Sequence, residues 1–474
     1  MTEPTALWSR AKRLSLANRS DERKKTARAF LGEHPVFRGT HGRMYQGVID
    51  AYHGETELAM DTAAAAALDA AWRELMTAAQ PREYWNGWLY DKRQPTLLRK
   101  LAAERLFQRL HRPAATVPGV RVAPEEVLVC PYSSTILLEE AVATIARPGG
   151  VLVAPEGYYK SAEEHIVKFG LALVTSPATP DGSFKIDPDA LARTLEQHAR
   201  QGDLCGVMLT LPGNPVVGDY TVTELTEIAR VLVAAEVPII CDMSFDLLID
   251  DHLPLAALTV DTPAGPVRLY DRMVSITGNS KAFNAFGPCK VGAVCSGDLD
   301  WLAAIRDRLR VSFQRETTHL VRATIEHTTE AYLAANRRHL NDQVEAAYRL
   351  LTGINSRCGA ELLRPLGSRQ GMFMTIEFDA DLMANAGVRE PYELEDLLLT
   401  VAGIDSVALD RTGSRRLGVR LNVAAPRRHQ DNDPGDLLAE LFDRLEHLLH
   451  RLHAGMSYPE ALGELRIPTI PVAS

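Results

Sequence analysis

Short apolar runs alternate with helical segments between about residue 120 and residue 297. The runs lack regular polar positions, whereas the segments between them repeat apolar residues every three or four positions, as helices do. Continuous apolar strands that alternate with helices predict a mostly parallel sheet covered on both faces. The runs that predict strands are 125–130, 150–155, 204–212, 237–242, 273–278 and 291–297.

The pattern changes on either side of this region. Helical periodicity is found at 61–79, 95–110 and 301–356. Alternating runs at 371–378 and 417–424 predict a smaller sheet, which an amphipathic helix at 434–452 would cover. The length favours division into lobes. We expect an N-terminal arm and segment packing on the small domain (1–80), a large domain (81–310), and a linking helix with a small C-terminal domain (311–474).

Composition narrows the class of protein. The chain has 474 residues, of which 46% are hydrophobic and 24% charged, and a formal net charge of -9. This charge argues against nucleic acid as the main partner, and no apolar run reaches the roughly 20 residues that span a bilayer. The N-terminus has no apolar signal region, which favours the cytoplasm. The six cysteines are scattered without metal-ligand spacing, so reduced thiols are expected.

The first 30 residues or so are basic. A solvated helix or a mobile arm is favoured over an arm that binds nucleic acid. Residues 1 to about 45, which include this stretch, could form an arm over a partner subunit or shape a substrate entrance.

Chemically complementary residues follow the predicted strands. They are Tyr158 and Tyr159, Asn214, Asp242 and Lys281. Singly, an Asn-Pro pair is a common turn, an aspartate often caps a helix, and a strand-end lysine usually extends to water. Lys281 lies in the run VSITGNSKAFNAFGPCKVG, which contains no acidic residue. Because the carboxyl ends of parallel strands meet at one ligand crevice, the set suggests a single cofactor.

The order of these residues resembles that of the fold type I pyridoxal phosphate enzymes, in particular the class I/II aminotransferase family, from about residue 50 to 425. The motifs are CPYSST at a helix start, an aromatic, Asn-Pro, Asp, the lysine, a basic residue and a late arginine. The resemblance implies an α/β fold, with a mostly parallel seven-stranded sheet between helices in the large domain and a smaller α+β C-terminal domain. It also implies pyridoxal 5'-phosphate as cofactor and a homodimer with shared active sites.

The resemblance assigns catalytic roles on chemical grounds. Lys281 would form a Schiff base with the cofactor aldehyde and move the Cα proton. Asp242 would face the pyridine nitrogen, and Asn214 would donate to the ring hydroxyl beside the substrate. Tyr159, rather than Tyr158, would stack on the ring.

Phosphate and substrate contacts follow in the same way. Hydroxyls at a helix N-terminus suit an anion. By resemblance the phosphate ligands are Ser133, Ser134, Thr135 and Lys290, with Tyr90 reaching the neighbouring subunit's phosphate. Ser280 belongs to the cofactor-binding set. Arg420 would grip the substrate α-carboxylate with its planar guanidinium. The segment VIDAYHGETEL makes Gly54 a candidate for close approach to the substrate.

The chain departs from the family pattern in three places. Phe245, in the cofactor-binding set, stands where a tyrosine usually donates to the ring hydroxyl. One extra residue separates Lys281 from Lys290, and Gly278 replaces a serine, for which Thr277 or Ser280 could substitute. A missing donor changes the proton affinity of the Schiff base.

The function expected is that of an enzyme acting on an α-amino acid through an external aldimine and Cα deprotonation, with transamination favoured. The alternative is β/γ-elimination or replacement in specialised metabolism, either C-S lyase-like, as SKAFN suggests, or like 1-aminocyclopropane-1-carboxylate synthase with S-adenosylmethionine. The sequence leaves this choice, the substrate and the acceptor open. A DNA-binding regulator would need a winged helix before residue 50, and a scaffold has no need of these residues together.

Overall fold

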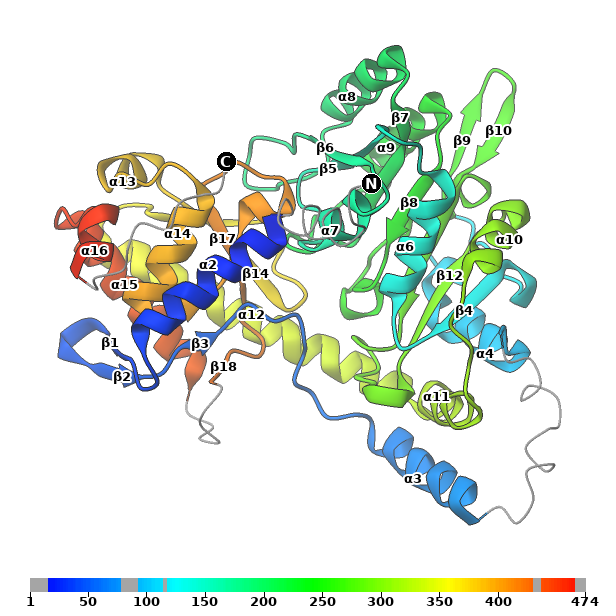
Figure 1. Cartoon of the computed structure of the whole chain (residues 1–474), viewed down its shortest axis with the longest axis horizontal. Coiled ribbons are helices and arrows are strands. Elements are labelled where there is room, and N and C mark those ends of the chain that lie inside the picture. Colours follow the sequence, from blue (N-terminus) through cyan, green and yellow to red (C-terminus); the bar gives the residue numbers. More distant parts are fainter. Residues whose placement is uncertain (1–15, 78–92, 114–116, 429–435, 465–474) are drawn as a thin grey trace, which may run out of the picture.

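The computed structural model describes residues 16–77, 93–113, 117–428 and 436–464. Two lobes lie side by side, and the long helix α12 (Glu330–Cys358) runs from one to the other (Figure 1). Each lobe is built around its own principal sheet.

The large lobe holds the predicted seven-stranded sheet. The order is β4 (Val127–Pro131), β12 (Val291–Cys295), β11 (Met273–Gly278), β8 (Ile239–Asp242), β7 (Leu204–Thr210), β5 (Val151–Pro155) and β6 (Ala172–Ser176). Strands β11, β8, β7, β5 and β6 are mutually parallel, whereas β12 runs antiparallel to both of its neighbours. The fold class expected from the sequence is therefore confirmed.

Both faces of this sheet are buried, which explains why its strands lack alternation. Along β4, Val127 and Val129 pack into one core, and Leu128 and Cys130 pack into another. The first core includes α8 (Pro188–Gln201) and α9 (Val222–Ala235), and the second includes α6 (Ser134–Ile145), α7 (Ala162–Val167) and α10 (Leu299–Arg308). The sheet is thus sandwiched between helices.

The six predicted strand runs all contain strands of this sheet, and one strand was missed. The missed strand is β6, whose residues are only partly buried because it lies at the sheet edge. Its sequence ALVTS ends in two polar residues and does not stand out as a buried run.

The predicted helical stretch 301–356 is three helices rather than one. They are α10, α11 (Arg315–His327) and α12. Thr329 caps α12 by accepting a hydrogen bond from the Tyr332 amide, so a new helix begins there. The predicted helix 95–110 is likewise divided into α4 (Thr96–Leu101), a π-helical turn and α5 (Gln108–His111).

The small lobe is built on an antiparallel four-stranded sheet. Its order is β13 (Leu363–Leu366), β14 (Phe373–Phe378), β17 (Gly418–Asn422) and β16 (Val407–Ala408). A three-stranded sheet joins β3 (Ile49–Asp50) to β15 (Ile404–Asp405) and β18 (Arg427–Arg428). The N-terminal segment therefore pairs with strands far along the chain.

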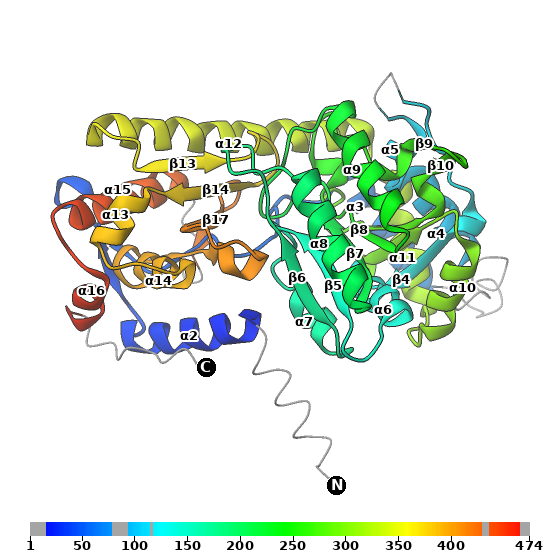
Figure 2. The same ribbon diagram turned by 90° about the horizontal axis from the view of Figure 1, so that it is seen from above.

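Helix α2 (Leu16–Leu31) packs on this lobe through buried ion pairs. Lys24 Nζ lies 2.8 Å from a Glu395 oxygen and 2.9 Å from an Asp405 oxygen, and Arg23 Nε lies 2.7 Å from Asp396 Oδ1. Figure 2 shows α2 and α12 on opposite sides of the small lobe. The described part of the basic N-terminal stretch is thus a helix held by acidic residues of its own chain.

The remaining elements complete the two lobes. They are α3 (Thr62–Thr77), α13 (Ala380–Asn385), α14 (Pro391–Leu397), α15 (Leu437–His453), α16 (Tyr458–Glu464), and the hairpins β1 (Val36–Arg38) with β2 (Met44–Gln46) and β9 (Thr259–Thr262) with β10 (Gly265–Arg268). Within the described ranges no helix combines the length and apolarity needed to cross a membrane. The domain boundaries at 80 and 310 stay predictions. The boundary at 310 lies in the sequence between β12, the last strand of the large sheet, and β13, the first strand of the four-stranded sheet.

Candidate active site

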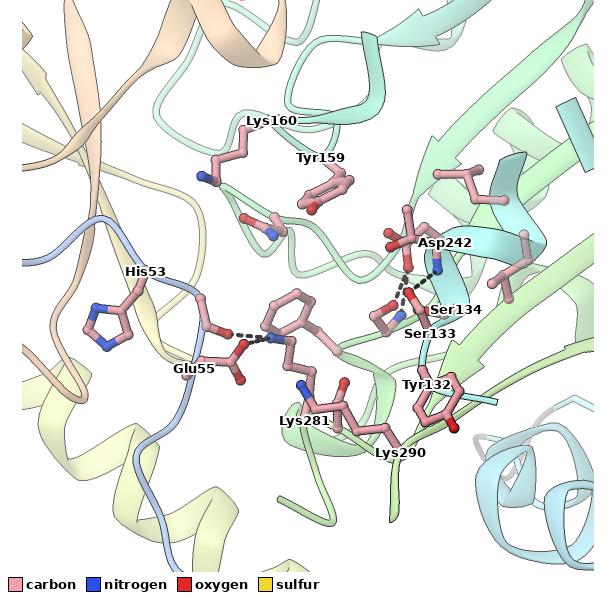
Figure 3. Close-up of a pocket in the computed structure, with 18 of the residues that line it drawn as sticks. His53, Glu55, Tyr132, Ser133, Ser134, Tyr159, Lys160, Asp242, Lys281 and Lys290 are labelled. Atoms are coloured by element: carbon pink, nitrogen blue, oxygen red, sulfur yellow. Dashed lines mark hydrogen bonds and ion pairs between the residues drawn. The ribbon is translucent and has the colours of Figure 1, made fainter. Parts of the chain in front are cut away.

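A pocket of about 360 Å³ lies at the carboxyl ends of the parallel strands, facing the small lobe. It collects the candidates that the sequence scattered over nearly 370 positions, as Figure 3 shows for several of them. The predicted residues that line it are Gly54, Ser133, Ser134, Thr135, Tyr159, Asn214, Asp242, Phe245, Ser280, Lys281, Lys290 and Arg420. Tyr90 lies outside the described residues.

The start of α6 offers an anion cradle. Ser133 is the N-cap, and its Oγ accepts a hydrogen bond of 3.0 Å from the Thr135 amide. Strand β12 passes so close that a Cβ on Gly292 would lie 2.5 Å from the Ser134 nitrogen. The glycine thus lets the strand approach the free amides of the first helical turn, where the helix dipole favours negative charge.

Asp242 ends β8 with its carboxylate held in place. Its Oδ1 accepts hydrogen bonds from the Ser244 amide at 3.0 Å and from the Ser244 hydroxyl at 2.6 Å. Burial raises the pKa of Asp242, and the Ser244 hydrogen bonds and the charge of Lys281 oppose that rise. A positively charged ring nitrogen beside this carboxylate would stabilise its ionised form.

Lys281 has an acidic partner after all, although a distant one in sequence. Its Nζ donates to the Gly54 carbonyl at 2.7 Å and to Glu55 Oε1 at 3.1 Å. Burial lowers the pKa of Lys281; Glu55 opposes that change, whereas Lys290 and Arg420 add to it. A lowered pKa increases the share of neutral amine, which is the nucleophilic form.

Arg420 is fully buried on β17 with no carboxylate beside it among the described residues. Its Nη1 donates to Asn214 Oδ1 at 2.8 Å, its Nη2 donates to the Tyr52 carbonyl, and its Nε has no partner there. The guanidinium stacks 4.0 Å from the Phe373 ring centroid. Burial lowers the pKa of Arg420 to about 9. A buried cation without a counter-ion is costly, so the site is suited to an anion.

The loop from 279 to 290 is fixed at its base. The Asn279 side chain donates to the Cys289 carbonyl at 2.8 Å and accepts from the Val291 amide at 2.8 Å. Within this loop Asn284 has a positive φ of 51° and donates to the Tyr332 hydroxyl. Lys281 and Lys290 nevertheless both line the pocket.

The other departures also have physical explanations. A Cβ on Gly278 would lie 2.8 Å from the Val291 carbonyl oxygen, which leaves no room for a serine. Of the two proposed substitutes Ser280 lines the pocket, whereas Thr277 is buried and donates to the Met243 carbonyl. Phe245 is buried edge-on against Phe373, with ring centroids 5.5 Å apart.

Two further expectations can be compared with the geometry. Tyr159 lines the pocket and Tyr158 does not. A Cβ on Gly54 would meet Phe373 at 3.7 Å and Lys281 Nζ at 4.0 Å, which are ordinary contacts. The Gly54 backbone is therefore close to the lysine, but this position does not demand glycine for space.

Six polar or aromatic lining residues were not singled out from the sequence. They are Tyr52, His53, Glu55, Tyr132, Lys160 and Ser244. Tyr52, His53 and Glu55 flank Gly54, and Lys160 follows Tyr159, so adjacency to a candidate was the available signal. Tyr132 has a left-handed φ of 73°, a strained conformation that cannot be seen in a sequence.

The donor set fits pyridoxal phosphate. The glycine-backed helix start suits the phosphate, Asp242 suits the ring nitrogen, and the amine of Lys281 suits the aldehyde. Fold and donor set together are those of the fold type I class of pyridoxal-phosphate-dependent proteins.

The chain belongs to the family described as aminotransferase class I and II, whose model matches residues 89–419. The family depends on pyridoxal phosphate, in agreement with the expected cofactor.

Known proteins resemble different portions of the chain. A curated Mycobacterium tuberculosis protein named "Probable N-succinyldiaminopimelate aminotransferase DapC" is 30% identical over 192 residues, which are 40% of this chain and 45% of that protein. Capreomycidine synthase from Streptomyces vinaceus is 28% identical over 216 residues, 45% of this chain and 52% of that protein. The chain thus matches about half the length of these curated relatives.

A solved structure resembles most of the fold. N-succinyldiaminopimelate aminotransferase from Mycobacterium tuberculosis superposes with a TM-score of 0.64 at 23% identity, covering 84% of this chain and 93% of that one. At this identity the likeness supports the fold alone.

Proposed function

We propose that this chain is a pyridoxal-phosphate-dependent aminotransferase, which moves an amino group between an α-amino acid and an oxo acid. The observation that carries the proposal is the single pocket in which Lys281, Asp242 and the buried Arg420 meet. Membership of the aminotransferase family supports the same activity.

The bound cofactor supplies a carbonyl that takes up the amine and a ring that accepts electrons. The chain does the rest. Ser133, Ser134 and Lys290 bind the phosphate, and the Asp242 carboxylate holds a proton at the ring nitrogen. The Arg420 guanidinium binds the α-carboxylate bidentately and thereby orients the bonds at Cα.

Lys281 then acts as the proton carrier. Its Nζ would take a proton from the substrate Cα, hold it, and give it up again within the same pocket. The lowered pKa of this amine favours the neutral form that can accept a proton. Phe245 and Tyr159 line the pocket with aromatic surface and help to exclude water.

A second candidate function is β/γ-elimination or replacement. Phe245 favours it, because no tyrosine hydroxyl is available at this position to stabilise the ring oxygen. Similarity to a capreomycidine synthase adds weight, since that protein's name describes a synthase rather than an aminotransferase. S-adenosylmethionine, considered above as a substrate, has no support in the relatives named here.

The proposal includes a homodimer in a reducing, cytoplasmic environment. Trp72 and Met76 on α3 are 50% and 71% exposed, so this helix presents apolar surface that a second subunit could cover. All six cysteines are free, as is usual for proteins of reducing compartments. Light scattering of the purified protein would test the dimer.

The activity is tested by adding pyridoxal phosphate and a panel of amino acids. We expect an absorbance band of the lysine-bound cofactor, borohydride trapping on Lys281, and conversion to the pyridoxamine form with release of an oxo acid. Release of ammonia or thiol would favour the second function instead. Lys281→Ala should abolish either outcome, and turnover of this variant at the wild-type rate would contradict the assignment.

A further inference from the structure

Lys160 places an amine in the pocket that the proposed chemistry does not use. It follows Tyr159 after β5 and lines the same cavity as Lys281 and Arg420. In Figure 3 it projects into the pocket from the Tyr159 side, whereas Lys281 and Lys290 reach it from the other.

The surroundings of Lys160 are cationic. Its Nζ lies 3.4 Å from the centroid of the Tyr52 ring, and the same ring is approached by Lys24 Nζ at 4.2 Å and the Arg411 guanidinium at 5.3 Å. Lys24 is paired with Glu395 and Asp405. Arg411 lies 3.4 Å from Asp21 Oδ1. Lys160 Nζ has no carboxylate partner among the described residues.

The other charges of the pocket already have assigned counterparts. Lys290 and the start of α6 suit the cofactor phosphate, Asp242 suits the ring nitrogen, and Arg420 suits the substrate α-carboxylate. Lys281 has the proposed role of attacking the carbonyl carbon of the cofactor. Lys160 alone is left without an anion, on the aromatic wall formed by Tyr52 and Tyr159.

We propose that Lys160 forms a subsite for a second carboxylate, so that the pocket selects an acidic amino acid or a dicarboxylic oxo acid. The inference rests on the proposed function, because it concerns the substrate class of the same site. Tyr52 supports the subsite from behind: its ring orients the ammonium, and its carbonyl is fixed by Arg420.

Protonation gives this subsite a second signature. Burial lowers the pKa of Lys160 to about 6; Arg411, Arg420 and Lys24 add to the decrease, and Asp21 opposes it. The empty subsite is therefore largely neutral at pH 8. A bound carboxylate favours the charged form, so binding at pH 8 should take up a proton, and this uptake should decrease as the pH is lowered from 8 towards 6.

The two sources of the second carboxylate are separated by half-reactions of the holoenzyme. Glutamate is compared with glutamine, and aspartate with asparagine, by the rate of conversion to the pyridoxamine form. The reverse half-reaction compares 2-oxoglutarate with 2-oxopentanoate. Wild type should prefer the acidic member in at least one direction, and Lys160→Gln should reduce that preference about 10- to 100-fold, as expected for a hydrogen bond to a charged group.

Binding without turnover provides the second readout. Calorimetric titration with glutarate in two buffers of different ionisation enthalpy measures proton uptake at pH 8, with butyrate as reference. Lys160→Arg should keep a preference for glutarate but lose the uptake, because a guanidinium stays protonated. The control Lys168→Gln, which removes a lysine paired with Glu139 on the same stretch, should leave preference and uptake as in wild type.

The outcomes separate the two proposals. No wild-type preference in either half-reaction, or equal losses with acidic and neutral substrates in Lys160→Gln, would overturn the subsite in favour of a role in supporting Tyr52. Proton uptake that persists in Lys160→Arg would overturn it as well. If no amino acid reacts at all, the proposed function has failed. In that case, proton uptake on glutarate binding that requires Lys160 still supports the subsite. Absence of this proton uptake overturns the subsite.

Discussion

The two sides of the pocket are built differently. The sheet side consists of Ser133, Ser134, Asp242, Lys281 and Lys290. The first four end or follow strands of the seven-stranded sheet, and Lys290 directly precedes the antiparallel strand β12. The small-lobe side consists of Tyr52, His53, Gly54, Glu55 and Arg420. Backbone geometry fixes the first set, because strand ends in a parallel sheet share one edge. Contacts between segments far apart in sequence fix the second set.

This difference has an energetic consequence. Arg420 donates to the Tyr52 carbonyl, and Tyr52 itself packs beneath Lys24 and Arg411. The small-lobe side therefore depends on the ion pairs of α2. The sheet side depends on buried apolar strands, which need no such partners.

Lys24→Met should have the largest effect on stability. This effect should concern the small-lobe side of the pocket. Although burial alone would raise it, the charges of Lys24 and Arg23 lower the pKa of Glu395 to about 2. Removing one partner of a buried ion pair typically costs about 3–5 kcal/mol. Urea unfolding at pH 7 should show this loss, and weakened substrate binding should exceed any weakening of cofactor binding.

The neighbouring Lys25→Met is the control, because Lys25 is exposed. Equal stability of the two variants would break the comparison, since the ion pairs of α2 would then contribute nothing to the small-lobe side. The Lys24–Glu395 contribution should be complete above about pH 4.5 and be lost as the pH falls towards 2, because the folded pKa lies below the unfolded one.

Arg420→Lys should have the next largest effect, on substrate rather than on cofactor. A lysine cannot form the bidentate contact with a carboxylate, so transition-state binding should weaken by about 2–4 kcal/mol. This loss corresponds to a fall in kcat/KM of roughly 30- to 1000-fold. The absorbance of the bound cofactor should persist. Arg364→Lys is the control, because Arg364 lies on β13 of the same sheet in an exposed pair with Glu377. A similar loss in both variants would contradict a role for Arg420 in binding the α-carboxylate.

Asp246→Asn tests whether a buried carboxylate lowers the stability of the large lobe, which carries the sheet side of the pocket. Asp246 lies just beyond Phe245, fully buried, and its two oxygens have no hydrogen-bond partner among the described residues. Burial raises the pKa of Asp246 to about 7, despite the opposing charges of Arg109 and Arg337. A raised pKa means that the stability of the protonated form is present below about pH 4 and lost as the pH rises through 7.

The variant should therefore gain stability over wild type between pH 4 and pH 8, by up to about 4 kcal/mol. Nearby His252 has the opposite slope, because burial lowers its pKa to about 3, so the difference between the two unfolding curves is the quantity to measure. Asp250→Asn, which alters an exposed partner of Arg337, is the matched control and should not reproduce the gain in stability. A flat difference for Asp246→Asn would contradict the assignment.

The difference between the two sides of the pocket also explains which site residues could be predicted from the sequence. Strand-end residues such as Asn214, Asp242 and Lys281 could be predicted, because a local pattern of apolar run followed by polar residue places them at one edge. The pairing of Lys281 with Glu55 could not, because 226 positions separate them and the intervening fold decides their contact. Lys160 could not be predicted as a site residue, because a lysine after two tyrosines has no pattern of its own; only the approach of Tyr52 makes it unusual.

The edge strand β6, the breaks between the helices in 301–356 and the reason for Gly278 could not be predicted from the sequence either. Strand β6 is short and only partly buried, and the stretch 301–356 has continuous helical periodicity although three helices form there. Gly278 read as a departure from the family pattern, yet its neighbour Val291 excludes a side chain. Packing between strands, which no single segment encodes, decided the last of these outcomes.

Phe245→Tyr should have the smallest effect and bears on the choice between the two candidate functions. Phe245 lines the pocket beside Asp242 but carries no hydroxyl. A tyrosine here would offer a donor to the cofactor's ring oxygen and stabilise its negative charge, which favours loss of the proton shared with the lysine linkage. The pKa read from the absorbance of the bound cofactor should fall by about one unit, or about 1.4 kcal/mol.

Phe286→Tyr is the matched control, because Phe286 lies on the same lobe, is 61% exposed and is outside the pocket lining. If transamination is the native reaction, the added donor should leave the oxo acid as the main product. If elimination is native, the ratio of ammonia to pyridoxamine form should fall in Phe245→Tyr and stay constant in Phe286→Tyr. A spectrum whose pH dependence matches wild type would show that position 245 does not reach the ring oxygen, and the argument from the missing hydroxyl would then lose its basis.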